Sequence, residues 1–259
     1  MIRSAVLVSG KGTKLQSLLD SVFFGEIPEL QLVAVISSDA NAYALKRARN
    51  AGIETVVVEP AMFPNDTSYD MAIRNKLKDM DIELVINAGF YPGVGRETAR
   101  SFHNKVIAVQ PSLIPAFETL RGDAVHEAVL ARGLKVTGAT AYLVDENGGV
   151  GPVLLQKAVP VLEDDDLTTL KRRVLTDAEW KLLPEAVKRF CAGKIRLHAA
   201  ARSCSSEKIN RYEAKTAPDR NWPGAVKLLE PARKCKADRA AGELEGARPA
   251  SNPILLSVC

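Results

Sequence analysis

The chain has 259 residues, of which 46% are hydrophobic and 25% charged, and it carries a formal net charge of +4. This length allows one well-buried core, or one domain with an appendage, and the composition is ordinary for a soluble globular protein. No apolar run approaches the ~18 residues that a membrane-spanning helix needs. The first residues also lack the apolar region and cleavage site of a secretory signal, so we expect a cytoplasmic protein with no membrane partner.

Strands and helices alternate through the first 110 residues. Apolar, β-rich segments predict strands over residues 3–9, 30–37, 54–58, 84–88 and 106–110. Helical periodicity between them predicts helices that begin at Lys14 and that cover 42–51, 68–80 and 96–102. Strands that alternate with helices in this way predict an α/β protein with an open, mostly parallel, doubly wound sheet.

The second half of the chain follows a different pattern. After an amphipathic helix over 124–132, two β-rich runs at 136–144 and 153–161 are joined by a glycine-rich segment, which predicts a β-hairpin. A helix is expected from Leu167 on, with acidic residues favourably placed at its N-terminus, and Pro184 should kink or restart it. The predicted sheet therefore ends in a C-terminal hairpin and helix.

The composition changes after residue 196. Residues 1–196 hold 24 basic and 24 acidic side chains, whereas residues 197–259 hold 11 basic and 7 acidic ones, so the net positive charge lies in the latter. Scattered prolines and the lack of sustained periodicity predict that 197–259 is a basic, largely disordered tail behind a folded domain at 1–196. The tail lacks interleaved aromatic residues, so we expect no nucleic-acid partner.

Cysteine and histidine predict no metal centre. The four cysteines follow no zinc-binding spacing, and three of them lie in the tail. Of the three histidines, His126 falls on the predicted helix over 124–132, where we expect it at the surface or at a cap. None of the histidines belongs to a recognisable catalytic constellation, so we expect neither a metal site nor a catalytic triad.

The loop Ser9–Lys14, between the first strand and the first helix, has the chemistry of an anion site. Its glycines allow backbone N–H groups to approach an anion at a helix N-terminus, while Thr13 can donate a hydroxyl hydrogen bond and Lys14 adds charge. Leu15 stands where a dinucleotide-binding loop has its third glycine, and the loop is not a P-loop either. The alternative is a tight turn that binds no ligand.

Several later segments, taken with this loop, resemble the motifs of the glycinamide ribonucleotide (GAR) transformylases, which are folate-dependent phosphoribosylglycinamide formyltransferases. These segments keep the family's order and spacing, and they are Asn87-Ala88-Gly89-Phe90, Gln110-Pro111-Ser112-Leu113-Ile114-Pro115, Val136-Thr137-Gly138-Ala139-Thr140 and Gly151-Pro152-Val153. The resemblance covers about residues 1–196 and implies the formyltransferase fold.

The resemblance implies a transferase of purine biosynthesis. Members of the family transfer a formyl group from 10-formyltetrahydrofolate to the amine of GAR, a small phosphorylated molecule. The implied substrate-binding residues are Gly12, Thr13, Lys14 and Glu179. The implied folate-binding residues are Phe90, Tyr91, Gly93 and Val94.

The chain departs from the family at the reaction centre. The family's catalytic Asn, His and Asp correspond to Ala108, Gln110 and Gly149. A histidine that is usual in the following hairpin strand corresponds to Tyr142. Gln110 is the one candidate catalytic residue of the three, because it can donate a hydrogen bond to an oxyanion, although it cannot titrate near pH 7 as histidine does. Ala108 and Gly149 offer no such group.

Three hypotheses about function follow. The first is GAR formyltransferase activity, which the family motifs support, although losing one oxyanion donor costs roughly 10²–10³ in rate. The second is a catalytically impaired relative that binds a phosphorylated ligand in a regulatory or binding role, which the preserved phosphate loop favours. A formyltransferase for a sugar nucleotide or an aminoacyl-tRNA is a weaker third hypothesis, because those enzymes use the same three side chains.

Overall fold

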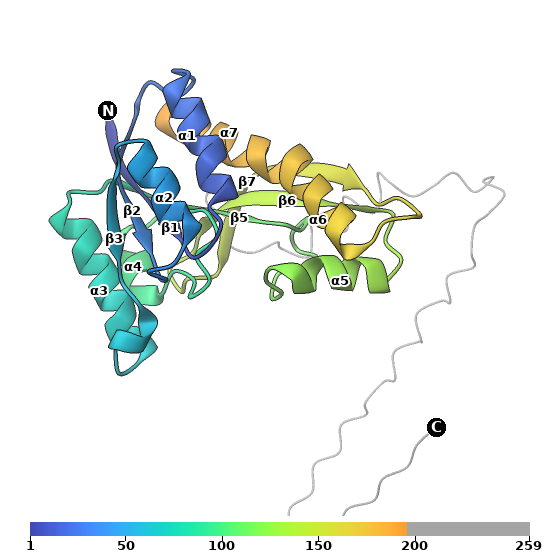
Figure 1. Cartoon of the computed structure of the whole chain (residues 1–259), viewed down its shortest axis with the longest axis horizontal. Coiled ribbons are helices and arrows are strands. Elements are labelled where there is room, and N and C mark those ends of the chain that lie inside the picture. The colour runs from blue at the N-terminus through green and yellow to red at the C-terminus, as the bar shows by residue number, and fades with distance from the viewer. Residues whose placement is uncertain (196–259) are drawn as a thin grey trace, which may run out of the picture. The chain divides into compact units, whose positions relative to one another are not determined.

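The computed structural model describes residues 1–195, which form a twisted seven-stranded sheet with helices on its faces (Figure 1). The strands are β1 (Ile2–Val8), β2 (Leu30–Ser37), β3 (Glu54–Val57), β4 (Leu84–Asn87), β5 (Val106–Gln110), β6 (Val136–Val144) and β7 (Val150–Pro160). Their order in the sheet is β3-β2-β1-β4-β5-β6-β7. β1 to β5 run parallel, whereas β6 and β7 pair antiparallel as a hairpin. The predicted fold class is confirmed.

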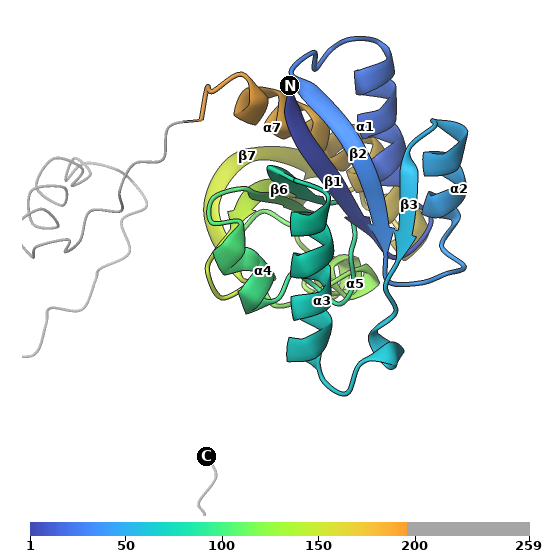
Figure 2. The ribbon, with the colours of Figure 1, turned by 90° about the vertical axis from the view of Figure 1, so that its left-hand side faces the viewer.

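Two layers of helices cover the sheet, one on each face (Figure 2). The first layer holds α1 (Thr13–Phe23), α2 (Tyr43–Asn50), α5 (Asp123–Ala131), α6 (Leu167–Val174) and α7 (Trp180–Cys191). The second layer holds α3 (Asp66–Asp79), which follows a short 3₁₀ turn at Pro60–Met62, and α4 (Arg96–Ser101). Successive residues of β1 alternate between the layers, because Val6 packs in one core and Leu7 in the other. This is why the parallel strands are apolar throughout.

The last helix is interrupted earlier than its proline predicts. α6 continues into one π-helical turn, Leu175–Glu179, and α7 then begins at Trp180 and contains Pro184. Pro184 has no N–H to donate to the carbonyl of Trp180, and the widened turn lies directly before that residue. Such turns are frequent at functional sites, and this one ends at Glu179.

His126 is buried, contrary to the surface or capping position that its helix predicts. His126 belongs to α5, which packs against α6, and the residue is only 4% exposed. An ion pair between Asp123 of α5 and Lys171 of α6 joins the two helices. The amphipathic pattern predicts α5 and its apolar stripe, but it does not reveal that the polar residue beside that stripe is buried as well.

The predicted tail at 197–259, with three of the four cysteines, lies outside the described residues. Within residues 1–195, no helix is long and apolar enough to cross a membrane. In the same part of the chain, no group of three or more His, Cys, Asp or Glu side chains could hold a metal ion.

Candidate functional site

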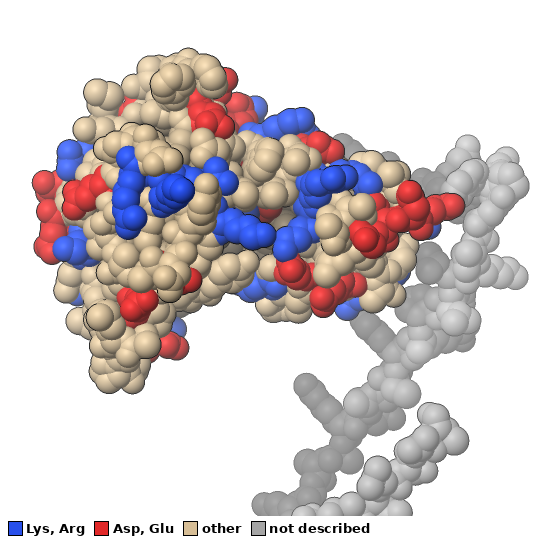
Figure 3. All heavy atoms as spheres, viewed as in Figure 1, with Lys and Arg blue, Asp and Glu red and all other residues tan. Residues whose placement is uncertain are grey.

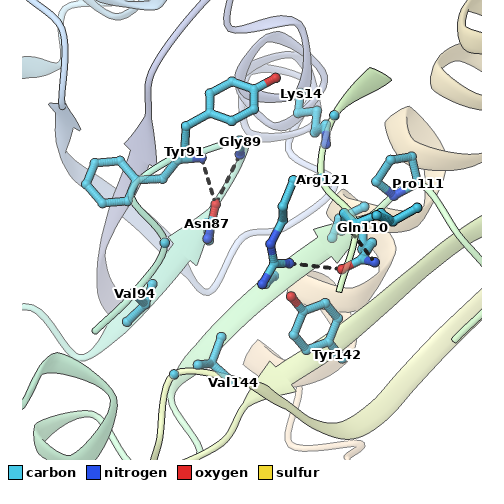
Figure 4. A pocket seen from close by; sticks show the side chains of 17 residues that line it. Lys14, Asn87, Gly89, Tyr91, Val94, Gln110, Pro111, Arg121, Tyr142 and Val144 are labelled. Carbon is cyan, nitrogen blue, oxygen red and sulfur yellow. Dashed lines mark hydrogen bonds between the residues drawn. The ribbon is translucent and has the colours of Figure 1, made fainter. Parts of the chain in front are cut away.

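The topology opens a crevice at the carboxyl ends of β1 and β4. From β1 the chain proceeds outward through β2 and β3, and it then returns to add β4 and β5 on the other side. Ligands of open α/β sheets bind at such a reversal of strand order. A cavity lies here, between the start of α1, the loops that follow β4 and β5, and the hairpin strand β6 (Figure 4).

The cavity brings together most of the residues that the sequence predicts. The predicted site residues that line it are Lys14, Phe90, Tyr91, Gly93, Val94, Ala108 and Gln110. Gly12 and Thr13 adjoin Lys14 at the start of α1, and Glu179 contacts Lys14 from the π-helical turn. Gly149 is not part of the lining, although its neighbour Gly148 is.

The loop after β1 presents the N-terminus of α1 at one end of the cavity. Gly12 precedes the helix with φ of 67°, and within the described chain no side chain caps the helix there. A Cβ atom at Gly12 would lie 2.6 Å from the Cβ atom of Ala44 in α2, so only glycine fits. The Ala44 N–H donates to the Gly10 carbonyl at 3.0 Å and fixes the loop against α2. Uncapped N–H groups at a helix start attract an anion.

Lys14 and Glu179 form an ion pair beside this helix start. Lys14 Nζ lies 2.5 Å from Glu179 Oε1, and the side chains are 17% and 6% exposed. The pair connects α1 to the π-helical turn, so two residues far apart in the sequence become neighbours. A carboxylate this buried needs its cation, because an uncompensated charge in the interior is costly.

The turn after β4 is held by hydrogen bonds of its own backbone. Asn87 Oδ1 accepts the N–H groups of Gly89 at 3.1 Å and Phe90 at 2.9 Å, and the Tyr91 N–H donates to Ser9 Oγ at 3.0 Å. The Gly93 N–H donates to the Phe90 carbonyl at 3.1 Å. Most backbone N–H groups of this turn therefore already have a hydrogen-bond acceptor within the protein.

Phe90 and Tyr91 have opposite environments in that turn. Phe90 is buried and stacks on Tyr69 of α3 with 6.3 Å between ring centroids. Tyr91 is 70% exposed and stands over the cavity (Figure 4). Val94 is buried and lines the cavity from the same turn. The turn thus offers a ligand its backbone carbonyls, the apolar side chain of Val94 and the exposed aromatic ring of Tyr91.

Gln110 is buried, and its carboxamide is already hydrogen-bonded. Nε2 donates to the Phe117 carbonyl at 2.9 Å and to Ser112 Oγ at 3.2 Å, while Oε1 accepts from Arg121 Nη1 at 3.0 Å. The side chain thereby ties the end of β5 to the loop before α5. Ala108, two residues earlier, forms the floor of the cavity.

Gly149 lies in the tight loop of the hairpin. Its N–H donates to Asp145 Oδ1 at 2.7 Å, and the Asn147 N–H donates to the same oxygen at 2.8 Å. A Cβ atom at Gly149 would lie 3.3 Å from both carboxylate oxygens of Asp145. One oxygen of the Asp145 carboxylate, Oδ1, is thus engaged by its own loop.

Arg121 is a cavity residue that the sequence analysis missed. It lies in the loop between β5 and α5, and its guanidinium group enters the cavity beside Gln110 and Tyr142 (Figure 4). The loop carries no motif that singles out this residue. The one signal in the sequence is that this basic residue precedes a glycine, Gly122. In the structure Gly122 has a φ of 58°, a conformation that glycine adopts readily in turns.

Positive charge surrounds this part of the molecule. Lys and Arg side chains gather in the middle of the face in Figure 3, from the region of α2 past the start of α1 to α6, and Asp and Glu lie mostly toward its ends. His126 adds no charge, because burial lowers the pKa of its imidazole to about 4. The field on this face favours an anionic ligand.

Comparisons with known proteins agree with this geometry. The family model described as Formyl transferase matches residues 2–187. The phosphoribosylglycinamide formyltransferase of Haemophilus influenzae is 31% identical over 197 residues, which cover 76% of this chain and 91% of that protein. The crystal structure of glycinamide ribonucleotide transformylase 1 from Symbiobacterium toebii has a TM-score of 0.72 and 39% identity, and it covers 77% of this chain and 92% of that one.

Larger proteins also contain a similar segment. The trifunctional purine biosynthetic protein adenosine-3 of Bos taurus is 37% identical over 203 residues, which cover 78% of this chain. The chain spans only 20% of the length of that protein.

Proposed function

Because the chain belongs to the formyl transferase family, and within it to the phosphoribosylglycinamide formyltransferases, we propose that it transfers a formyl group from 10-formyltetrahydrofolate to the amine of GAR. The observation that carries this proposal is one continuous cavity, which extends from Lys14 past Ala108 to the turn at Phe90. Direct transfer requires that amine and formyl donor meet in a single space, held in a reactive orientation.

The phosphate end of GAR belongs at the start of α1. Gly12 allows the approach, the N–H groups at Thr13 and Lys14 face the anion, and the basic side chains on this face add attraction. Glu179 is held next to Lys14 and offers a carboxylate to the polar groups of the substrate beyond its phosphate.

The pterin ring of the folate belongs at the turn that includes Phe90, Tyr91, Gly93 and Val94. Because the N–H groups of Tyr91 and Gly93 are engaged and Pro92 has none, the ring would bind chiefly through carbonyl oxygens of the turn, which accept from its amino and N–H groups. Tyr91 and Val94 supply apolar contacts on either side.

The transfer is balanced in atoms and electrons. The lone pair of the GAR amine forms a bond to the formyl carbon, and the C=O π pair moves to the oxygen. When that pair returns, the bond from the carbon to N10 of the folate breaks. One proton passes from the GAR nitrogen to N10, so the products are formyl-GAR and tetrahydrofolate.

An assay of formyl transfer from 10-formyltetrahydrofolate to GAR tests the proposal. The parent chain is compared with a restored variant that carries Ala108→Asn, Gln110→His and Gly149→Asp. Turnover by the parent above the uncatalysed rate supports the proposal. If the restored variant turns over and the parent does not, the chain is instead a binding protein on the same scaffold.

The phosphate assignment has its own test. GAR is expected to raise the melting temperature of the parent, and to raise that of the Thr13→Ala, Lys14→Ala double variant much less. An equal shift in both proteins would place the phosphate elsewhere. This measurement is independent of turnover, so it also applies to a chain that binds GAR without reacting.

A further inference from the structure

Three residues that line the cavity stand in one row across the sheet. Asn87 of β4 pairs with Ala108 of β5, and Ala108 pairs with Tyr142 of β6. Paired residues on neighbouring strands point to the same side of a sheet, so these three side chains share one face. Ala108 occupies the position of the family's catalytic Asn, and the carboxamide of this row stands one strand away, at Asn87.

Asn87 is held with its donor side away from the turn. Because Oδ1 accepts two backbone N–H groups, of Gly89 and Phe90, the hydrogen bonds fix which end of the carboxamide is oxygen. Nδ2 lies on the opposite side of the group (Figure 4). A donor fixed in advance needs no reorganisation when negative charge develops beside it.

Arg121 is held in the same cavity by Gln110. Its Nη1 donates to Gln110 Oε1 at 3.0 Å, and Gln110 is itself anchored by the Phe117 carbonyl at 2.9 Å. Gln110 stands where the family has a protonatable His, so the guanidinium brings a positive charge next to that position. An arginine keeps this charge at every pH at which the protein is folded, unlike an imidazole.

Resting on the formyl transfer proposed above, we propose that Asn87 and Arg121 form the oxyanion site of this chain and that Gln110 is the positioning residue for Arg121. As the GAR amine bonds to the formyl carbon, Asn87 Nδ2 and the remaining N–H groups of Arg121 stabilise the charge on the formyl oxygen. The charge is lost again when the bond to N10 breaks. The proton that the amine loses passes to N10, and Asp145 Oδ1 is engaged by the N–H groups of Asn147 and Gly149.

Steady-state kinetics of the full chain test this assignment. Asn87→Asp keeps the acceptor for Gly89 and Phe90 but replaces the donor with a negative charge, and Arg121→Ala removes the cation. Each is expected to lower kcat by about 10²–10³ and to change the KM for GAR less than about threefold. Arg100→Ala, which removes an exposed arginine of α4, is the matched control and should keep the parent's kcat.

Two further readouts separate a direct role from a structural one. Added guanidinium ion is expected to restore part of the kcat of Arg121→Ala and none of that of Asn87→Asp. The parent's kcat should show no imidazole titration between about pH 5 and 9. Gln110→His should introduce one below the usual pH of about 6.5, because burial and the Arg121 guanidinium both lower the pKa of an imidazole at this position.

The outcomes distinguish this inference from the proposed function. If the parent turns over and both variants keep kcat within about threefold, the inference is overturned and the function stands. A parent without turnover overturns both. A fall in kcat that guanidinium does not restore, together with a lowered melting temperature, assigns Asn87 and Arg121 a structural role and also overturns the inference.

Discussion

Gly12 shows how one residue sets the geometry of the phosphate loop. It combines a left-handed φ of 67° with a contact to Ala44 that leaves no space for a Cβ atom. We expect Gly12→Ala to lower the free energy of unfolding by about 2–4 kcal/mol, from backbone strain and overpacking together. Gly10→Ala is the control, because a Cβ atom there meets nothing within 4 Å. Urea unfolding measures both, and equal effects would contradict this account.

Gly149 shows what restoring a lost carboxylate would cost. A side chain there starts 3.3 Å from the Asp145 oxygens, so Gly149→Asp places two carboxylates together. Two neighbouring negative charges raise the pKa of one carboxyl group above its value in the unfolded chain. The folded variant is therefore favoured while that group is protonated, and its free energy of unfolding falls as the pH rises through the raised pKa. We expect Gly149→Asp to be less stable than Gly149→Ala at pH 7 by about 1 kcal/mol, and the gap to close near pH 4. A gap that does not vary with pH, measured by urea unfolding, would contradict the coupling.

The residues of the site show where sequence reasoning stops. Lys14 and Glu179 carry motif positions and can be predicted, because a motif preserves residue type and spacing. The role of Arg121 cannot, since it depends on a hydrogen bond to Gln110, which lies eleven residues earlier at the end of β5. The orientation of Asn87 is set locally by the N–H groups of Gly89 and Phe90. Residue types are visible in a sequence, but the partner that occupies each polar atom is not.

At the scale of elements, the strands were the most predictable. Runs of β-branched and aliphatic residues bounded the strands at 30–37, 106–110 and 136–144 as the structure has them. The glycine-rich connection at 145–152 indicated the hairpin, because tight hairpin turns need residues that adopt a positive φ, as Gly148 does with a φ of 84°. The π-helical turn at Leu175–Glu179 was not predictable, since Pro184 predicts an interruption of the helix but not that the turn before Trp180 widens.

The contact between α1 and the π-helical turn depends on the Lys14–Glu179 pair. Lys14→Met leaves a buried carboxylate without its cation and is expected to cost about 3 kcal/mol of unfolding free energy. Glu179→Gln is expected to cost less, because Lys14 lines the cavity and water can reach it. The double variant Lys14→Met, Glu179→Gln should recover part of the loss. Additive losses in this double-mutant cycle would show that the two side chains are not coupled.

Burial of His126, on α5, makes stability depend on pH. Desolvation lowers the pKa of the imidazole from its usual 6.5 to about 4, Asp123 opposes the shift, and Lys171 and Lys14 add to it. The unfolded chain therefore binds more protons between these values, so stability is present above pH 6.5 and is lost as the pH falls toward 4.

We expect the parent to lose about 2 kcal/mol more unfolding free energy between pH 7 and pH 5 than His126→Leu does. His103→Gln is the control, because His103 is exposed and pairs with Glu146 at the surface. If His126→Leu shows the same pH dependence as the parent in urea unfolding, His126 is not the buried neutral group responsible.

At the scale of the whole molecule, the described residues hold a buried core on each face of the sheet. Val187 in α7 is among the last residues buried in it, and the family match ends at residue 187. The change in composition predicts a domain boundary after residue 196. We therefore expect a chain that ends at residue 195 to fold by itself, to melt within about 2 °C of the full chain, and to keep its melting shift with GAR.

Limited proteolysis of the full chain, followed by mass spectrometry, tests the same boundary from the other direction. Cleavage is expected first after residue 195, because the scattered prolines and the lack of sustained periodicity in the following sequence predict an open chain. The shortened chain should then resist further digestion, since its backbone hydrogen bonds are buried in the sheet and its two helical layers. A shortened chain that aggregates, or that melts more than about 5 °C below the full chain, would show that residues after 195 complete the domain.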